Sequence, residues 1–213
     1  MPRNLPRYDQ EFARSKTLVI SYTEHIEQTR IRAGTGPGAI LRMSDVEFSY
    51  ELAYLRMFVA WEVLLENVLV RLMCGYQHSG GQETLKNGAR YYRTIADAEA
   101  AVLAGRQYKL WHNPRHVIER AERFLESSRF ETVLKSAEST LGHYAAVRHR
   151  IAHSQKHAQR EFDRATMTLT GKRYQGSRPG RFLRDWVAAS NPPKRWISAT
   201  SDGLQGLAQQ ICI

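Results

Sequence analysis

An arginine and three histidines lie within ten residues of one another in the second half of the chain, at Arg148, His149, His153 and His157. Histidine is the side chain whose ordinary pKa lies closest to neutral pH, so it can accept or release a proton there. A guanidinium stays charged and can hold a phosphate oxygen with paired N–H donors. These residue types together are suited to acid–base chemistry on an anionic substrate.

The apolar residues around this set predict that it lies on a helix. Leu141, Tyr144 and Ala152 fall within about 40° of Phe130 on a helical wheel counted from that residue. Arg148 falls at the centre of the same stripe, where a buried charge needs a partner or a wet cavity. Two acids on the flank of an earlier helix, Glu51 and Glu62, are candidates for that partner.

Two interpretations of these residues involve no catalysis on RNA. In the first, His149, His153 and His157 form an i, i+4, i+8 ladder, continued by Glu161, that could bind a divalent metal. The strongly positive surroundings oppose a cation, and we expect no metal and no other cofactor. In the second interpretation, Arg148 forms an ordinary ion pair and the histidines are surface residues.

In the third interpretation, Arg148, His149 and His153 cleave phosphodiester bonds. RNA carries its own nucleophile, the 2′-hydroxyl, which a histidine can deprotonate, and a histidine can also protonate the departing 5′-oxygen. A guanidinium can neutralise the charge that develops on the phosphorus centre. One helix supplies a single such set, whereas two copies related by a two-fold axis would supply both an acid and a base.

The distribution of charge favours an anionic partner for this part of the chain. The net charge is +10, and Leu141 to Arg184 holds ten Lys or Arg against two acids. A solvated basic face is the plain alternative, but its overlap with the Arg and His residues makes nucleic acid, and RNA in particular, the expected partner. The candidate substrate-binding residues are Arg150, Lys156, His157 and Arg160.

The cysteines and the apolar runs indicate the compartment. Cys74 and Cys212 stand in unrelated contexts and form neither a disulfide framework nor a zinc spacing, which fits a reducing cytoplasm. Charged residues interrupt every apolar run before it reaches 18 residues. We expect a soluble, cytoplasmic protein with no membrane partner.

The elements that would position the site are helices. Apolar periodicity and start and stop signals predict six helices. The first two span 8–33, which ends at a Gly34–Gly38 loop, and 44–73, which starts with a Ser44-x-x-Glu47 capping box. The others run from Thr94 to Gly105, from Asn113-Pro114 to about 126, from Ser128 through the Arg/His residues to about 170 with a bend near Ser154, and from Ser201 to the end. A basic, flexible loop is expected over 171–180, and no strand pattern is convincing. The fold class is all-α, a bundle of five to seven helices with long central helices.

Arg148-His149-Arg150-Ile151-Ala152-His153 resembles the Arg-polar-x3-His signature of the HEPN superfamily. Its setting is similar as well. A long helix with Ala60-Trp61-Glu62 precedes it, then Tyr108-x-x-Trp111-x-Asn113-Pro114, and Pro179-Gly-Arg-Phe-Leu183 follows, like the tail segment of some bacterial HEPN groups.

The resemblance implies a single HEPN-like helical domain over 1–213, with a core at about 44–170 on which the basic loop and C-terminal helices of 171–213 pack. It implies a homodimer with the motif helices facing each other and the active site at the interface. It further implies a metal-independent endoribonuclease that leaves a 2′,3′-cyclic phosphate and a 5′-hydroxyl. Arg148 and His153 would be the catalytic pair and His149 the assisting polar residue.

Such domains often serve as toxins in toxin–antitoxin pairs or as antiviral-defence effectors, so an antitoxin partner is a further expectation. The alternative is a HEPN module that has lost catalysis and only binds RNA or another partner through the same basic face.

Overall fold

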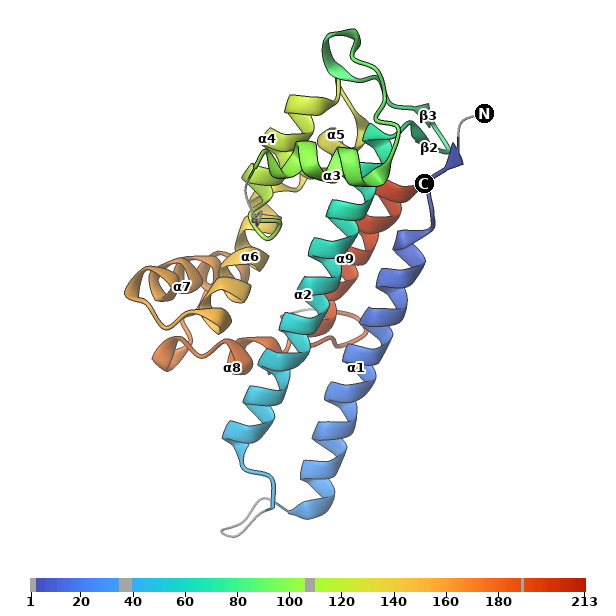
Figure 1. The fold of residues 1–213 in the computed structure, drawn as a ribbon. Coiled ribbons are helices and arrows are strands. Elements are labelled where there is room, and N and C mark those ends of the chain that lie inside the picture. Colours follow the sequence, from blue (N-terminus) through green and yellow to red (C-terminus); the bar gives the residue numbers. More distant parts are fainter. Residues whose placement is uncertain (1–2, 35–39, 106–109, 189) are drawn as a thin grey trace. The chain divides into compact units, whose positions relative to one another are not determined.

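The computed structural model describes residues 3–34, 40–105, 110–188 and 190–213, and within these ranges the chain is mostly helical (Figure 1). The prediction of an all-α fold with long helices is confirmed, although the described residues form nine α-helices rather than five to seven. The helices are α1 (Tyr8–Ala33), α2 (Met43–Met73), α3 (Ile95–Leu103), α4 (Pro114–Phe124), α5 (Arg129–Ser136), α6 (Glu138–Ala152), α7 (Lys156–Thr170), α8 (Pro179–Arg184) and α9 (Trp196–Cys212). None of these helices is long and apolar enough to cross a membrane.

The chain falls into two compact units. Unit 1 comprises Met1–Phe12, Val59–Leu141 and Gln205–Ile213, and unit 2 comprises Ala13–Phe58 and Gly142–Leu204. The boundaries fall inside α1, α2, α6 and α9, so each of these helices contributes residues to both units. The Arg and His residues of interest belong to unit 2, and the expectation of one domain over 1–213 stays a prediction.

Three predicted helix starts are confirmed by hydrogen bonds. The Thr94 hydroxyl accepts from the N–H of Asp97 at 3.1 Å, and the Asn113 side chain accepts from the N–H of Arg115 at 3.1 Å, with a proline in the first turn. Ser128 accepts from the N–H of Glu131 at 3.1 Å. Each side chain satisfies one of the N–H groups that the first turn leaves without a helical partner.

The expectation of one continuous helix from Ser128 through the motif is wrong. α5 ends at Ser136, and Ala137 has φ −109° and ψ 6°, so α6 starts afresh at Glu138. A helical wheel counted from Phe130 therefore no longer gives the direction of residues in α6, Arg148 included. Within α6 the buried positions are Leu141, Tyr144 and Val147, and Arg148 is half-buried at the edge of that stripe. The expected bend near Ser154 is a full break between α6 and α7.

Two further predicted caps are corrected. α2 begins at Met43, and the Asp45 carboxylate accepts from the N–H of Arg42 at 2.9 Å, so Ser44 lies inside the first turn. α9 begins at Trp196 instead of after Ser201, whose buried hydroxyl donates to the carbonyl of Ser198 at 2.9 Å. A serine inside a helix can satisfy its hydroxyl on the preceding turn, which removes the need for it to act as a cap.

The expected flexible loop over 171–180 is packed in part. It contains a single turn of tighter helix, η2 (Gln175–Ser177). Tyr174, Ser177, Pro179 and Gly180 are buried, and the other residues of the loop are exposed. Gly171 ends α7 in the left-handed conformation, and α8 already starts at Pro179.

In unit 1, the second half of α2 supplies much of the core. Trp61, Leu65 and Leu69 are almost fully buried, and the Phe12 ring meets Trp61 edge-on at 6.1 Å between centroids. A small sheet in the order β1-β2-β3 joins β1 (Arg3–Asn4), β2 (Tyr76–His78) and β3 (Gly81–Gln82), with β1 parallel and β3 antiparallel to β2. The prediction of no strands is wrong here, because strands of two or three residues show no alternating pattern. A turn of tighter helix, η1 (Lys86–Gly88), follows the sheet.

In unit 2, α1 and α2 lie side by side (Figure 1), and the Tyr50 hydroxyl of α2 donates to the Glu27 carboxylate of α1 at 3.1 Å. Val46 and Tyr54 of α2 are buried, as are Tyr144 and Val147 of α6. An aromatic cluster joins the later elements. The Phe182 ring of α8 contacts the rings of Phe162, Tyr174 and Trp196 at centroid distances of 6.1, 5.5 and 5.3 Å.

Candidate active site

The structure brings three histidines together at the junction of α6 and α7. The ring centroid of His149 lies 4.7 Å from that of His153 and 6.3 Å from that of His157. His153 and His157 are exposed, whereas His149 and the neighbouring Arg148 are half-buried. We call Arg148, His149, His153 and His157 the Arg/His cluster. It brings together imidazoles from α6, from α7 and from the break between them.

His149 is held toward its neutral form. Burial lowers the pKa of His149, and the charges of His153, His157 and Arg148 lower it further, while the Glu161 carboxylate opposes them. The Nε2 atom of His157 lies 3.1 Å from Glu161. A neutral imidazole can accept a proton, so the environment favours His149 as a base.

Arg150 is bound to the main chain. Its Nε donates to the carbonyl of Ser177 at 3.1 Å, and its Nη1 donates to the carbonyl of His153 at 3.2 Å. The Ser177 hydroxyl in turn donates to the Asp163 carboxylate of α7 at 2.7 Å. Arg150 thus fixes the end of α6 that carries His153, and its expected role in binding substrate stays a prediction. No sequence signal marked Ser177 or Asp163 as part of this support.

The segment that holds Ser177 is anchored on α2. The Gly180 N–H donates to Glu51 at 2.9 Å, and Arg178 forms an ion pair with Glu47. A Cβ atom on Gly180 would lie 2.1 Å from the Glu47 carbonyl oxygen, so this close approach requires glycine. Burial raises the pKa of Glu51, against the opposing effect of the Gly180 N–H. A bond from Glu51 or Glu62 to Arg148 stays a prediction.

The other expected substrate-binding residues lie on α7. Lys156, His157 and Arg160 are all exposed in its first turns. Farther along the same helix, Arg160 and Arg164 line a surface hollow of about 470 Å³ together with Arg173. Cationic side chains thus continue away from the Arg/His cluster along α7.

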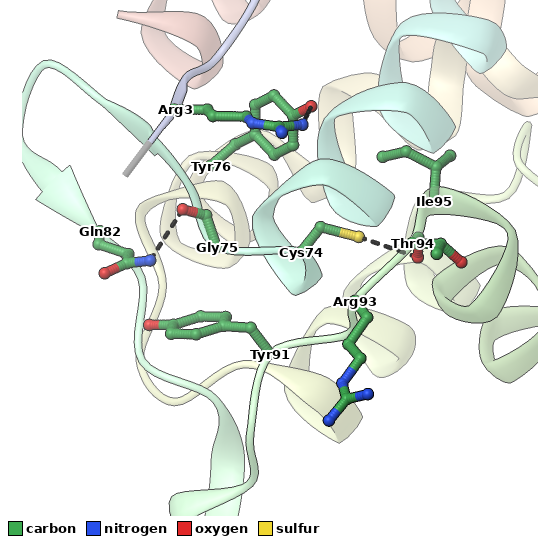
Figure 2. A pocket seen from close by; sticks show the side chains of 9 residues that line it. All are labelled: Arg3, Cys74, Gly75, Tyr76, Gln82, Tyr91, Arg93, Thr94 and Ile95. Carbon is green, nitrogen blue, oxygen red and sulfur yellow. Dashed lines mark hydrogen bonds between the residues drawn. The ribbon is translucent and has the colours of Figure 1, made fainter. Parts of the chain in front are cut away.

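Unit 1 has a pocket of its own, of about 390 Å³ (Figure 2). It is lined by Arg3, Cys74, Gly75, Tyr76, Gln82, Tyr91, Arg93, Thr94 and Ile95. The Cys74 thiol donates to the Thr94 carbonyl at 3.3 Å, and the Tyr91 hydroxyl donates to the Glu83 carbonyl at 2.6 Å. Gly75 has φ 80°, and a Cβ there would lie 2.8 Å from the Gln82 amide nitrogen, so the wall needs glycine.

The chemistry available in this pocket is limited. Its described lining residues include no histidine and no carboxylate, so it has no group that exchanges protons near neutral pH. Burial raises the pKa of the Cys74 thiol, which disfavours the nucleophilic thiolate. The pocket offers two arginines and two tyrosines for binding, while the Arg/His cluster offers proton transfer.

No protein-family model, curated protein or solved structure matches the chain. Of the residues that resemble the HEPN setting, Tyr108 lies outside the described residues, Trp111 is buried, and the Pro179–Leu183 segment forms most of α8. Within the described ranges, His, Cys, Asp and Glu side chains form no group of three arranged to hold a metal ion.

Proposed function

We propose that the chain is a metal-independent endoribonuclease whose active site is the Arg/His cluster. The observation that carries the proposal is the meeting of His149, His153 and His157 beside Arg148 on a basic surface. Proton transfer by positioned side chains contributes about 10²- to 10⁴-fold to a reaction rate. That contribution requires groups that titrate near neutral pH at the reacting atoms.

The chemistry uses the nucleophile of the substrate itself. His149, whose environment favours the neutral form, accepts the proton of the 2′-hydroxyl, and that oxygen attacks the adjacent phosphorus. The exposed His153 donates a proton to the departing 5′-oxygen, and Arg148 balances the charge on the non-bridging oxygens. The products are a 2′,3′-cyclic phosphate and a 5′-hydroxyl. We further propose that the enzyme acts as a toxin or defence effector and that an antitoxin partner restrains it.

The proposal also places the active site at the interface of a homodimer. Two copies facing each other across a two-fold axis would bring two sets of Arg148 and His153 around one phosphate. Mixing Arg148→Ala protein with His153→Ala protein tests this arrangement, because a mixed dimer could assemble one intact shared site. Recovery of cleavage on mixing is expected, and no recovery under conditions of subunit exchange would contradict a shared site. Light scattering on the wild type should give a dimer.

The main experiment asks whether the purified protein cleaves RNA in EDTA. Cleavage is expected on ordinary RNA, with cyclic phosphate ends, and no cleavage is expected on a 2′-O-methyl copy that lacks the nucleophile. Absence of cleavage in EDTA and with added Mg²⁺, Mn²⁺ or Zn²⁺ would sink the proposal and favour a module that only binds RNA. Cleavage that requires a metal would favour the histidine ladder as a metal site.

A further inference from the structure

A pocket of about 390 Å³ in unit 2 combines positive charge with an exposed indole. It is lined by Lys172, Arg173, Tyr174, Gln175, Arg181, Arg184, Asp185, Trp186 and Arg195. We call it the Trp186 pocket. Five of these side chains are Lys or Arg and one is a carboxylate, so the pocket as a whole is cationic.

Part of this charge is already neutralised within unit 2. Arg184 binds the Glu27 carboxylate at 2.6 Å, and Arg195 lies 3.5 Å from the same group. Burial alone would raise the pKa of Asp185, but bonds from Lys172 and the Tyr174 hydroxyl outweigh it and lower the pKa. Asp185 is therefore an anion fully engaged in the pocket wall.

Two arginines remain available for a ligand. Arg173 and Arg181 are both exposed, and among the described residues neither is bonded to a carboxylate. Arg173 also lines the neighbouring hollow on α7, which we call the α7 hollow. Its other lining residues are Arg160, Asp163, Arg164, Met167 and Thr168, and its one carboxylate, Asp163, already accepts from the Ser177 hydroxyl. The two hollows share this residue, so cationic side chains run from the α7 hollow to the Trp186 pocket.

Trp186 provides a flat apolar surface at this place. Its side chain is 53% exposed, which is unusual for so large an aromatic group, and Arg195 lies over its ring at 4.4 Å. A main-chain bridge between Trp186 and Arg195 fixes the base of the side chain. An indole held by a cation, with much of its surface open, is suited to stacking an unpaired base.

We propose that the Trp186 pocket and the α7 hollow together bind single-stranded RNA, with one base stacked on Trp186 and backbone phosphates on Arg160, Arg164, Arg173 and Arg181. The choice of RNA as the polymer rests on the proposed function. A base must be free of its neighbours to stack on a side chain, so the pocket selects single strands over duplexes. The Arg/His cluster and the α7 hollow both include residues of α7, so a bound strand that follows this helix leads to the candidate active site.

The test measures binding without cleavage. A fluorescent 2′-O-methyl RNA of about a dozen nucleotides, in the range that single-strand sites cover, is titrated with wild-type protein and variants. Trp186→Ala should weaken binding by about 5- to 150-fold, the usual effect of removing one stacking aromatic, and Trp186→Phe should restore most of it. Tyr91→Ala is the matched control, since it removes an exposed aromatic ring from the unit 1 pocket.

The salt dependence separates stacking from charge. In a plot of log affinity against log salt concentration, the Arg173→Gln, Arg181→Gln double variant should reduce the magnitude of the slope by about 1 to 1.5. Trp186→Ala should leave the slope unchanged. Arg14→Gln with Arg32→Gln removes the same charge from exposed positions on α1 of unit 2 and should leave the slope near the wild-type value.

Several results would overturn the inference. Unchanged affinity of Trp186→Ala, or equal affinity for a duplex of the same length, would remove the stacking site. Loss of affinity in Tyr91→Ala alone would transfer the site to unit 1. A polyglutamate peptide that binds as tightly as RNA, with the same dependence on Trp186, would identify an acidic protein segment as the ligand. Cleavage of ordinary RNA is measured separately, so either proposal can fail while the other stands.

Discussion

The pocket of unit 1 and the Arg/His cluster of unit 2 are both basic surface sites, but they differ in what their side chains can do. The unit 1 pocket places two arginines beside tyrosines and a protonated thiol (Figure 2). In the cluster, the ring centroids of His153 and His157 lie 4.7 and 6.3 Å from that of His149, which follows Arg148 in the sequence. Positive charge alone attracts an anion, whereas proton transfer needs groups that titrate near neutral pH.

The supports of the two sites differ as well. The Arg/His cluster is tied by Arg150 to Ser177 and to the carbonyl of His153, and Ser177 is held by Asp163. In the unit 1 pocket, the hydrogen bonds of Cys74 and Tyr91 end on the main-chain carbonyls of Thr94 and Glu83. A polar group already bonded to the wall is less available to a substrate. Catalysis is therefore expected in unit 2 alone, and the following experiments test that difference.

The largest effect is expected on cleavage. If the proposed function is right, His153→Ala and Arg148→Ala should each lower the rate of RNA cleavage by about 10²- to 10⁴-fold, because each removes a group that the proposal places at the reacting phosphate. Arg93→Ala, in the unit 1 pocket, is the matched control and should leave the rate near the wild-type value. Rates are measured on a labelled RNA, and circular dichroism confirms that each variant is folded. A stronger loss in Arg93→Ala than in His153→Ala would reverse the comparison.

The second effect concerns the thiols of unit 1. Burial raises the pKa of Cys212 to about 12, so its thiolate fraction at neutral pH should be far below that of a free cysteine. Burial also raises the pKa of Cys74. Both should react slowly with iodoacetamide at neutral pH in the native protein and quickly in urea. Rapid alkylation of native Cys74 would show a reactive nucleophile in the unit 1 pocket.

The third effect tests the support of the cluster. Gly180→Ala would force a Cβ against the Glu47 carbonyl, so the free energy of unfolding should fall by about 1–3 kcal/mol. Gly142→Ala in α6 is the control, because open space surrounds that position and alanine favours a helix by about 1 kcal/mol. Urea denaturation measures both variants. Equal stability of Gly180→Ala and wild type would mean that α8 can move away from α2 without cost.

The smallest effect is a pH dependence of stability from His149. Its pKa is lowered in the folded protein, first by burial and then by His153, so below the ordinary value of about 6.5 the unfolded chain binds more protons. The contribution of His149 to stability is complete above that pH and is lost as pH falls through the lowered pKa. Urea denaturation at about pH 7.5 and 5.5 should show a smaller pH difference in His149→Gln than in wild type. An equal difference would place the titration elsewhere.

The sequence predicted well those features that depend on neighbouring residues. The bounds of α1 and the caps at Thr94, Asn113 and Ser128 all follow from local signals, whereas the break after α6 was predicted only as a bend near Ser154. The interruption at Ala137 has no such signal, because neither glycine nor proline stands there. The strand pair β1–β2 joins residues some seventy positions apart, and two-residue strands have no readable period.

The candidate site was predictable to a similar degree. The i, i+4, i+8 spacing of His149, His153 and His157 predicts neighbouring positions on one helix. The three rings do lie close together, but His157 contacts His149 across the break between α6 and α7. The hydrogen bonds of Arg150 depend on where the later loop packs, which no local pattern determines. The sequence did not predict the Trp186 pocket for the same reason. The aromatic residues that stand among the arginines of 172–195 are the one signal that indicates it.

The division of four helices between the two units has a consequence for how the protein is made. Unit 1 needs residues of α1 and of the last turns of α9, and unit 2 needs α9 up to Leu204. Neither unit can be completed during synthesis until the helix after Trp196 has left the ribosome. Contacts between residues far apart in the sequence form slowly, so we expect the two units to fold late instead of segment by segment. The Arg/His cluster and the pockets of both units would therefore take shape only when nearly the whole chain has been made.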